Sequence, residues 1–77
     1  MVDVAKLKIG DKVHYVKPHN KNEWENGIVK TINDRTDKYY NVFIVYNCGG
    51  DWDNYMDYTG ANTNPRDLEY GWRHYGR

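Results

Sequence analysis

Hydrophobic and polar residues alternate over short stretches at the start of the chain, a pattern typical of β-strands. In residues 6–16, KLKIGDKVHYV, the alternation puts Val13 and Tyr15 on one side of an expected strand and polar residues on the other. Residues 17–26 are mostly polar and predict a loop around Pro18. The apolar segment GIVKTI that follows predicts a second strand.

The strongest strand signal is YYNVFIVYN, residues 39–47. Apolar side chains occupy both of its faces, as expected of a central strand. NDRTDK before it predicts a tight turn, and the paired glycines of CGGD after it predict another, because glycine tolerates positive φ. DWDNYMDYT then predicts a fourth strand, with Trp52, Met56 and Tyr58 on one face.

The segment NTNPRDLEYGW predicts a short helical turn near residues 64–69. Asn64 can cap this turn and Pro65 suits its first helical position. Leu68 is then expected to plug the core. Four or five short strands joined by tight turns indicate an all-β fold, a small closed five-stranded barrel without free sheet edges.

Length and composition fit one small domain. We expect a single domain over residues 1–77, with a barrel core at about 8–70 and a C-terminal tail at 71–77. Hydrophobic residues make up 39% and the mean hydropathy is −1.03, too polar for a membrane span. The single cysteine, Cys48, excludes an internal disulfide and is expected to pack as a small hydrophobic residue. The N-terminus lacks a signal-peptide pattern, so we expect a cytoplasmic protein.

The stretch GGDWDNYMDYTG, residues 49–60, alternates aspartates with aromatic rings. Acidic and basic residues balance at 11 each, but this part of the chain is acidic and has Arg66 as its nearest basic residue. Carboxylates beside rings attract a cation, which favours a recognition surface. Two alternatives are a packed strand with its rings in the core, and a hairpin that pairs with a second copy to form a homodimer.

The order KIGDKVHY, NGIVKTI, YYNVFIVYNCGGD and a late RDL resembles the Tudor domain over residues 8–68. That family starts its first strand after Gly-Asp, ends its second in Val/Ile-x-x-Ile, and has a third of the form V-x-F-x-x-Y-x-x-G. The same motifs are similar to those of other SH3-like barrels, including KOW-type domains of ribosomal and transcription proteins. The pattern DWDNYxxYT…DLxxGW also resembles small bacteriophage or bacterial proteins.

The Tudor resemblance implies a non-catalytic module that binds a methylated or other cationic side chain of a protein or peptide in an aromatic cage. Tyr46 matches the cage aromatic that ends the third strand. Other cage positions fall on Lys17, Glu25 and Gly49, so a cage would have to be rebuilt from neighbouring rings. We predict a partner-binding face on the 18–27 loop and the 47–58 hairpin, formed by Trp24, Tyr46, Asp51, Trp52, Asp53 and Tyr55.

The alternative function is nucleic-acid binding in the manner of KOW-like domains. Basic strand faces and the Trp/Arg tail would contact phosphates and stack on bases. The candidate residues are Lys12, Lys17, Lys30, Trp72 and Arg73. With no net charge on the chain, this binding is expected to be weak and salt-sensitive. In a purely structural role, Trp72 would instead pack against the barrel.

The sequence contains no pattern that indicates catalysis. Its three histidines lie far apart, and none stands at a metal-ligand spacing from Cys48. DWDNYMDYTGAN lacks the glutamate of a calcium loop at its twelfth position, where Asn62 stands. We therefore expect no enzyme activity, no metal and no cofactor.

Overall fold

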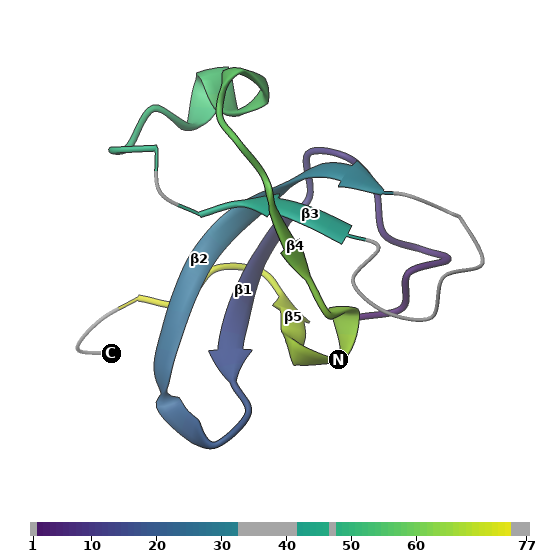
Figure 1. Cartoon of the computed structure of the whole chain (residues 1–77), viewed down its shortest axis with the longest axis vertical. Helices are drawn as coiled ribbons and strands as arrows, with labels where there is room; N and C mark the ends of the chain where they lie inside the picture. Colours follow the sequence, from purple (N-terminus) through teal and green to yellow (C-terminus); the bar gives the residue numbers. More distant parts are fainter. Residues whose placement is uncertain (1, 33–41, 47, 75–77) are drawn as a thin grey trace.

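The computed structural model describes residues 2–32, 42–46 and 48–74. These residues form five strands and two 3-10 helices: β1 (Lys12–Lys17), β2 (Asn20–Ile32), β3 (Val42–Val45), η1 (Trp52–Asp57), β4 (Ala61–Thr63), η2 (Pro65–Asp67) and β5 (Leu68–Tyr70). The strands pair antiparallel in one sheet, in the order β4-β3-β2-β1-β5 (Figure 1). The expected all-β class and five strands are confirmed. Within the described ranges no pairing joins β4 to β5, so this sheet is open and does not show the expected closed barrel without free edges.

Two expectations fall partly or wholly outside the described residues. The tight turn expected at NDRTDK, residues 33–38, cannot be compared with the structure. The first residues of the expected 39–47 strand, and its last, also lie outside the description.

The long strand β2 bends and pairs with different neighbours along its length (Figure 1). Its first half pairs with β1 and its second half with β3. Val29 pairs with Ile44 and Thr31 with Phe43, so Lys30 is an extra residue that locally increases the twist. The polar loop expected over residues 17–26 is wrong for most of its length. Exposed polar side chains are compatible with a strand whose backbone is paired, as this one is with β1.

One hydrophobic cluster fills the interior of the sheet. The expected core residues Val42, Ile44 and Leu68 are 0% exposed, which confirms their assignment. Val2 and Leu7 also belong to this cluster, although they precede the expected core. Tyr15 and Tyr46 pack against its margin; the full set of partly buried neighbours is Val4, Tyr15, Ile32 and Tyr46.

The opposite side of the sheet also carries buried residues. Ile28 and Val45 adjoin core residues in sequence and therefore point to the other face. Both residues are buried. The helix η1, which follows β3 in the chain, contacts β2. Cys48 is a free thiol and is buried, as expected of a small packed hydrophobic residue. The central strands are thus covered on two sides.

The fourth strand expected at residues 51–59 is wrong, because η1 occupies most of this segment. The Asp51 carboxylate accepts hydrogen bonds from Asn54 Nδ2 at 2.8 Å and from the Tyr58 hydroxyl at 2.9 Å. Short polar side chains that bond locally favour turns over extended pairing. The expected placement of Trp52, Met56 and Tyr58 on one face of a strand therefore does not apply, and residues 52–57 do not form the second strand of the expected hairpin.

The helical turn expected near residues 64–69 is confirmed as η2. The Asn64 side chain accepts a hydrogen bond from the Arg66 backbone N–H at 3.1 Å, and Pro65 opens the turn. The chain then enters β5 with Leu68 buried in the core.

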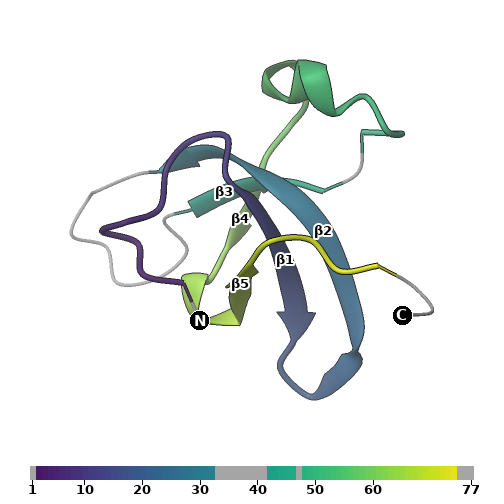
Figure 2. The ribbon, with the colours of Figure 1, turned by 180° about the vertical axis from the view of Figure 1, so that it is seen from behind.

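After β5, residues 71–74 form an extended segment that we call the strap. It crosses over β1 and β2, as seen from behind in Figure 2. The Trp72 indole N–H donates to the Gly27 carbonyl at 2.8 Å. The Asn26 amide donates to the Arg73 carbonyl at 2.8 Å and its oxygen accepts from the Arg73 N–H at 2.9 Å. Trp72 thus packs against the sheet, which was the structural alternative for this residue.

Candidate functional site

Three of the six expected partner-binding residues line one hollow. Trp24 comes from β2, Tyr46 lies directly after β3, and Trp52 begins η1. The hollow has a volume of about 300 Å³, and we call it the Trp24 hollow. Its remaining lining residues are Glu25, Asn26, Arg73 and His74.

A cation of the chain itself already lies in the Trp24 hollow. The guanidinium carbon of Arg73 is 4.9 Å from the centroid of the Trp24 ring, within the range of a cation–π contact. Arg73 Nη1 also lies 3.4 Å from the Lys21 carbonyl oxygen, to which it donates. With the Asn26 bonds to its backbone, Arg73 is fixed at both its main chain and its side chain. This hollow therefore accommodates a guanidinium against a ring.

A second hollow, the Tyr15 hollow, adjoins the first and has a volume of about 470 Å³. Tyr46 and Glu25 line both hollows and separate them. The rings of Tyr15 and Tyr46 meet edge to face, with centroids 6.2 Å apart and planes at 70°. The other lining residues come from the β1–β2 turn and from the chain through η2: Pro18, Asn62, Thr63, Asn64, Arg66 and Asp67.

Tyr46 is held at the junction of the two hollows by its hydroxyl. This hydroxyl lies 2.8 Å from Thr63 Oγ1, in a hydrogen bond that either group can donate. Burial raises the pKa of Tyr46 to about 12 against the opposing effect of the Thr63 hydrogen bond, and Tyr15, Glu25 and Asp67 add to the rise. The ring is thus kept neutral beside two carboxylates.

The raised pKa of Tyr46 predicts a loss of stability at alkaline pH. Because the folded-state pKa of about 12 lies above the ordinary value of 10.0, the stabilisation is present below pH 10 and declines as pH rises toward 12. Urea unfolding of the protein and of Tyr46→Phe at several pH values in this window measures the effect. The unfolding free energy of the variant should fall less steeply. Equal slopes in the two proteins would contradict the assignment.

The other three expected binding residues lie outside both hollows. Asp51 is occupied in the turn around η1, where its hydrogen bond raises the pKa of Tyr58. Asp53 is exposed on η1. The Tyr55 hydroxyl lies near Gly10, at 3.3 Å from where a Cβ on that glycine would stand. The acidic stretch therefore supplies one ring, Trp52, to the site, while Glu25 of β2 supplies the carboxylate.

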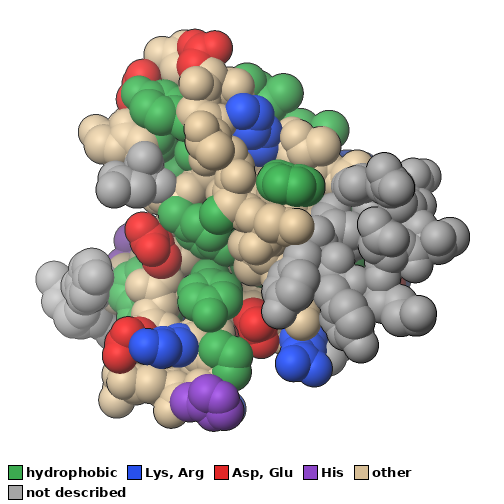
Figure 3. Space-filling model, in the orientation of Figure 1, with side chains coloured by type: hydrophobic (Ala, Val, Ile, Leu, Met, Phe, Trp, Pro, Cys, Tyr) green, Lys and Arg blue, Asp and Glu red, His purple; other side chains and the backbone are tan. Residues whose placement is uncertain are grey.

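The five candidate nucleic-acid residues do not line one common hollow. Lys12 lies over the Trp72 ring, 4.7 Å from its centroid, and the ring of Trp52 is 4.8 Å from that of Trp72. Lys30 donates to the Tyr58 carbonyl. Figure 3 shows acidic, basic and hydrophobic side chains interspersed on the face in view. That face has no continuous basic surface, and nucleic-acid binding stays a prediction.

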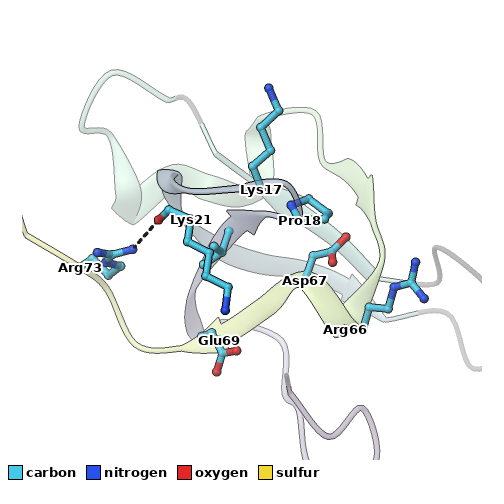
Figure 4. Close-up of a pocket in the computed structure, with 8 residues that line it drawn as sticks. Lys17, Pro18, Lys21, Arg66, Asp67, Glu69 and Arg73 are labelled. Carbon is cyan, nitrogen blue, oxygen red and sulfur yellow. Dashed lines mark hydrogen bonds between the residues drawn. The ribbon is translucent and has the colours of Figure 1, made fainter.

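Lys17 and Arg73 do line a common groove, of about 390 Å³ (Figure 4). Lys21 and Arg66 add two basic groups, and the groove also contains Asp67 and Glu69. Lys17 is paired with Glu23 outside it, at 3.4 Å. Carboxylates therefore offset much of the positive charge that a phosphate would require.

Sequence reasoning missed the roles of Arg73, Tyr15 and Asp67 in this region. Tyr15 was expected in a strand and Asp67 in a helical turn, and both expectations are correct. They lie beside Tyr46 because the chain returns through η2 to β5, and β5 pairs with β1. Local periodicity carries no signal for that contact. The one available signal was Glu25, which falls on a cage position in the Tudor resemblance.

The chain matches no protein-family model, and no curated protein or solved structure shows significant similarity to it. In the part of the chain that the structure describes, no three His, Cys, Asp or Glu side chains are grouped so that they could hold a metal ion. The same residues include no helix with the length and hydrophobicity needed to cross a membrane.

Proposed function

We propose that the protein is a non-catalytic interaction module, an SH3-like barrel of the Tudor type, that binds a cationic side chain of a protein or peptide. The strand order and the 3-10 turn before β5 support this fold. The observation that carries the function is the Arg73 guanidinium over Trp24, in a hollow that also contains Tyr46, Trp52 and Glu25.

The chemistry of the Trp24 hollow suits an arginine side chain. A planar guanidinium lies flat on an aromatic face, and a neighbouring carboxylate complements its charge. Such a contact contributes about 0.5–2 kcal/mol, which is enough for a weak module but not for tight binding by itself. The partner's cation must compete with Arg73, which is tethered and therefore present at a high effective concentration.

This competition defines the experiment. Binding of the peptide Gly-Arg-Gly is followed by tryptophan fluorescence or by amide chemical shifts. Arg73→Gln should strengthen binding, because it removes the guanidinium that competes for the Trp24 ring. Trp24→Leu in the Arg73→Gln background should weaken it by about 2–30-fold, the equivalent of one lost cation–π contact.

Glu23→Gln is the matched control, because Glu23 is an exposed carboxylate on the same strand that lines neither hollow. Its affinity for the peptide should equal that of the parent protein. Peptide binding that is indifferent to Trp24→Leu would refute the proposal.

A further inference from the structure

The Tyr15 hollow contains two carboxylates without partners in the described structure. Glu25 and Asp67 line it, and among the described residues neither makes an ion pair or a side-chain hydrogen bond. Arg66 is the basic group in the lining, and it forms no ion pair with Asp67 among these contacts. The lining is thus acidic by one charge, which favours a cationic occupant.

The aromatic part of the hollow has the shape of a corner. Tyr15 and Tyr46 stand at 70° to one another, so a group placed between them contacts a ring face on one side and a ring edge on the other. Glu25 and Asp67 both raise the pKa of Tyr46, which indicates a negative potential at this ring. A bound cation would offset that negative potential.

The two hollows differ in whether a cation of the chain already lies against their aromatic rings. The Trp24 hollow holds the chain's own guanidinium. Over the described residues, the cation–π contacts of the chain involve Trp72 and Trp24, and neither Tyr15 nor Tyr46. The Tyr15 hollow therefore offers two rings that no cation–π contact of these residues occupies, and its one basic lining residue is Arg66.

We infer that the Tyr15 hollow is a second cation site that binds a lysine ammonium, so that the partner is a basic peptide with an arginine and a lysine side chain. The inference rests on the proposed function, because it takes the arginine to lie at Trp24. An ammonium is a compact charge with three donors, which suits Glu25, Asp67 and the amide of Asn62. Because Tyr46 and Glu25 border both hollows, the two cations would lie side by side on one peptide.

The test compares two sets of peptides by calorimetric titration on the full chain with Arg73→Gln, which removes the competing guanidinium from Trp24 in this and all further variants. One set has arginine and lysine separated by one to three glycines, and the other has norleucine in place of the lysine. Norleucine keeps the aliphatic chain and removes the ammonium. At the best spacing, the lysine peptide should bind roughly threefold to tenfold more tightly than its norleucine partner.

Variants then locate the lysine contribution. Asp67→Asn keeps the side-chain shape and removes the charge, so it should abolish most of the difference between the two peptides. Tyr15→Leu should do the same, and melting curves show whether each variant is folded. The control Glu23→Gln should preserve the difference. Chemical shifts of the Tyr15 and Tyr46 rings should move with the lysine peptide and not with norleucine.

The outcomes separate this inference from the proposed function. If lysine and norleucine peptides bind equally while Trp24→Leu weakens both, the second site is refuted and the Trp24 site stands. If the lysine preference depends on Asp67 while Trp24→Leu has no effect, the Tyr15 hollow stands and the Trp24 site is refuted. If neither peptide binds at millimolar concentration, both are refuted.

Discussion

Ile44→Ala is expected to lower the free energy of unfolding by about 2–5 kcal/mol, the usual cost of a large buried aliphatic side chain. Ile44 is 0% exposed and lies in β3, between β2 and β4. Its Cγ2 atom also closes over Gly27, so its loss leaves a gap at the centre of the sheet. Because a small domain is stabilised by only a few kcal/mol more than this, the variant should be largely unfolded or close to it.

Urea unfolding followed by tryptophan fluorescence and circular dichroism measures this loss. Ile9→Ala is a matched control, since Ile9 is 54% exposed and its truncation should change the unfolding free energy by no more than about 0.5 kcal/mol. A cooperative transition of Ile44→Ala with the midpoint of the parent protein would show that β3 is not the centre of the core.

The elements that could be predicted from the sequence are those with local signals. β1 has apolar alternation, and its predicted face agrees with the burial of Val13, while the apolar run GIVKTI predicted the second half of β2. η2 was predictable because a cap and a proline stand at adjacent positions, Asn64 and Pro65. Each of these signals is contained within a few residues and needs no distant partner.

The segment of η1 shows where the local pattern misleads. Its rings and aspartates alternate as they would in a strand, but extended backbone needs a partner for its N–H and C=O groups. Here the backbone N–H groups of Asn54 and Tyr58 donate locally to the carbonyls of Asp51 and Tyr55, each at 3.1 Å, and the Tyr58 hydroxyl donates to the Asp51 carboxylate. The bond to Tyr58 spans seven residues, which a period-two reading does not consider.

The aromatic residues of the candidate site could be predicted from the sequence, but the charged residue that lies against them could not. Trp24, Tyr46 and Trp52 lie on three separate elements, and the Tudor resemblance was needed to associate them. Arg73 was assigned to nucleic acid because basic groups beside rings are typical of such tails. The strap brings it onto Trp24 through its bonds to Asn26, across 47 residues of sequence. No composition or spacing rule anticipates that pairing.

Gly27→Ala is expected to destabilise the protein by about 1–3 kcal/mol or more, through overpacking. A Cβ at this position would meet Ile44 Cγ2 at 2.5 Å, the Val45 carbonyl oxygen at 2.8 Å and Tyr46 Cδ1 at 3.0 Å. The Val45 oxygen is a backbone atom of the paired strand and cannot rotate away. Alanine's advantage over glycine in a strand, about 0.5–1 kcal/mol, is smaller than the cost of this clash.

Gly49→Ala separates a steric clash from a backbone effect. Gly49 has a φ of +62° and nothing within 4 Å of an added Cβ, so its cost is the left-handed backbone alone, about 1–2 kcal/mol. Urea unfolding of both variants compares the two costs. A Gly27→Ala variant as stable as the parent protein would mean that β2 and β3 can separate without penalty.

Gly27→Ala should also weaken the binding of basic peptides beyond its effect on stability. The added methyl group presses on the Tyr46 ring, which borders both hollows, and it lies in the strand whose carbonyl at Gly27 receives the Trp72 indole N–H. A displaced Tyr46 changes the corner it forms with Tyr15 and the border that it shares with the Trp24 hollow. Peptide titration under conditions where the variant is fully folded isolates this effect. Gly49→Ala, at equal folded fraction, should bind the same peptide with the affinity of the parent protein, because Gly49 lines neither hollow. If Gly27→Ala and Gly49→Ala bind equally well, the position of Tyr46 does not control recognition, and the cation sites must be independent of the ring they share.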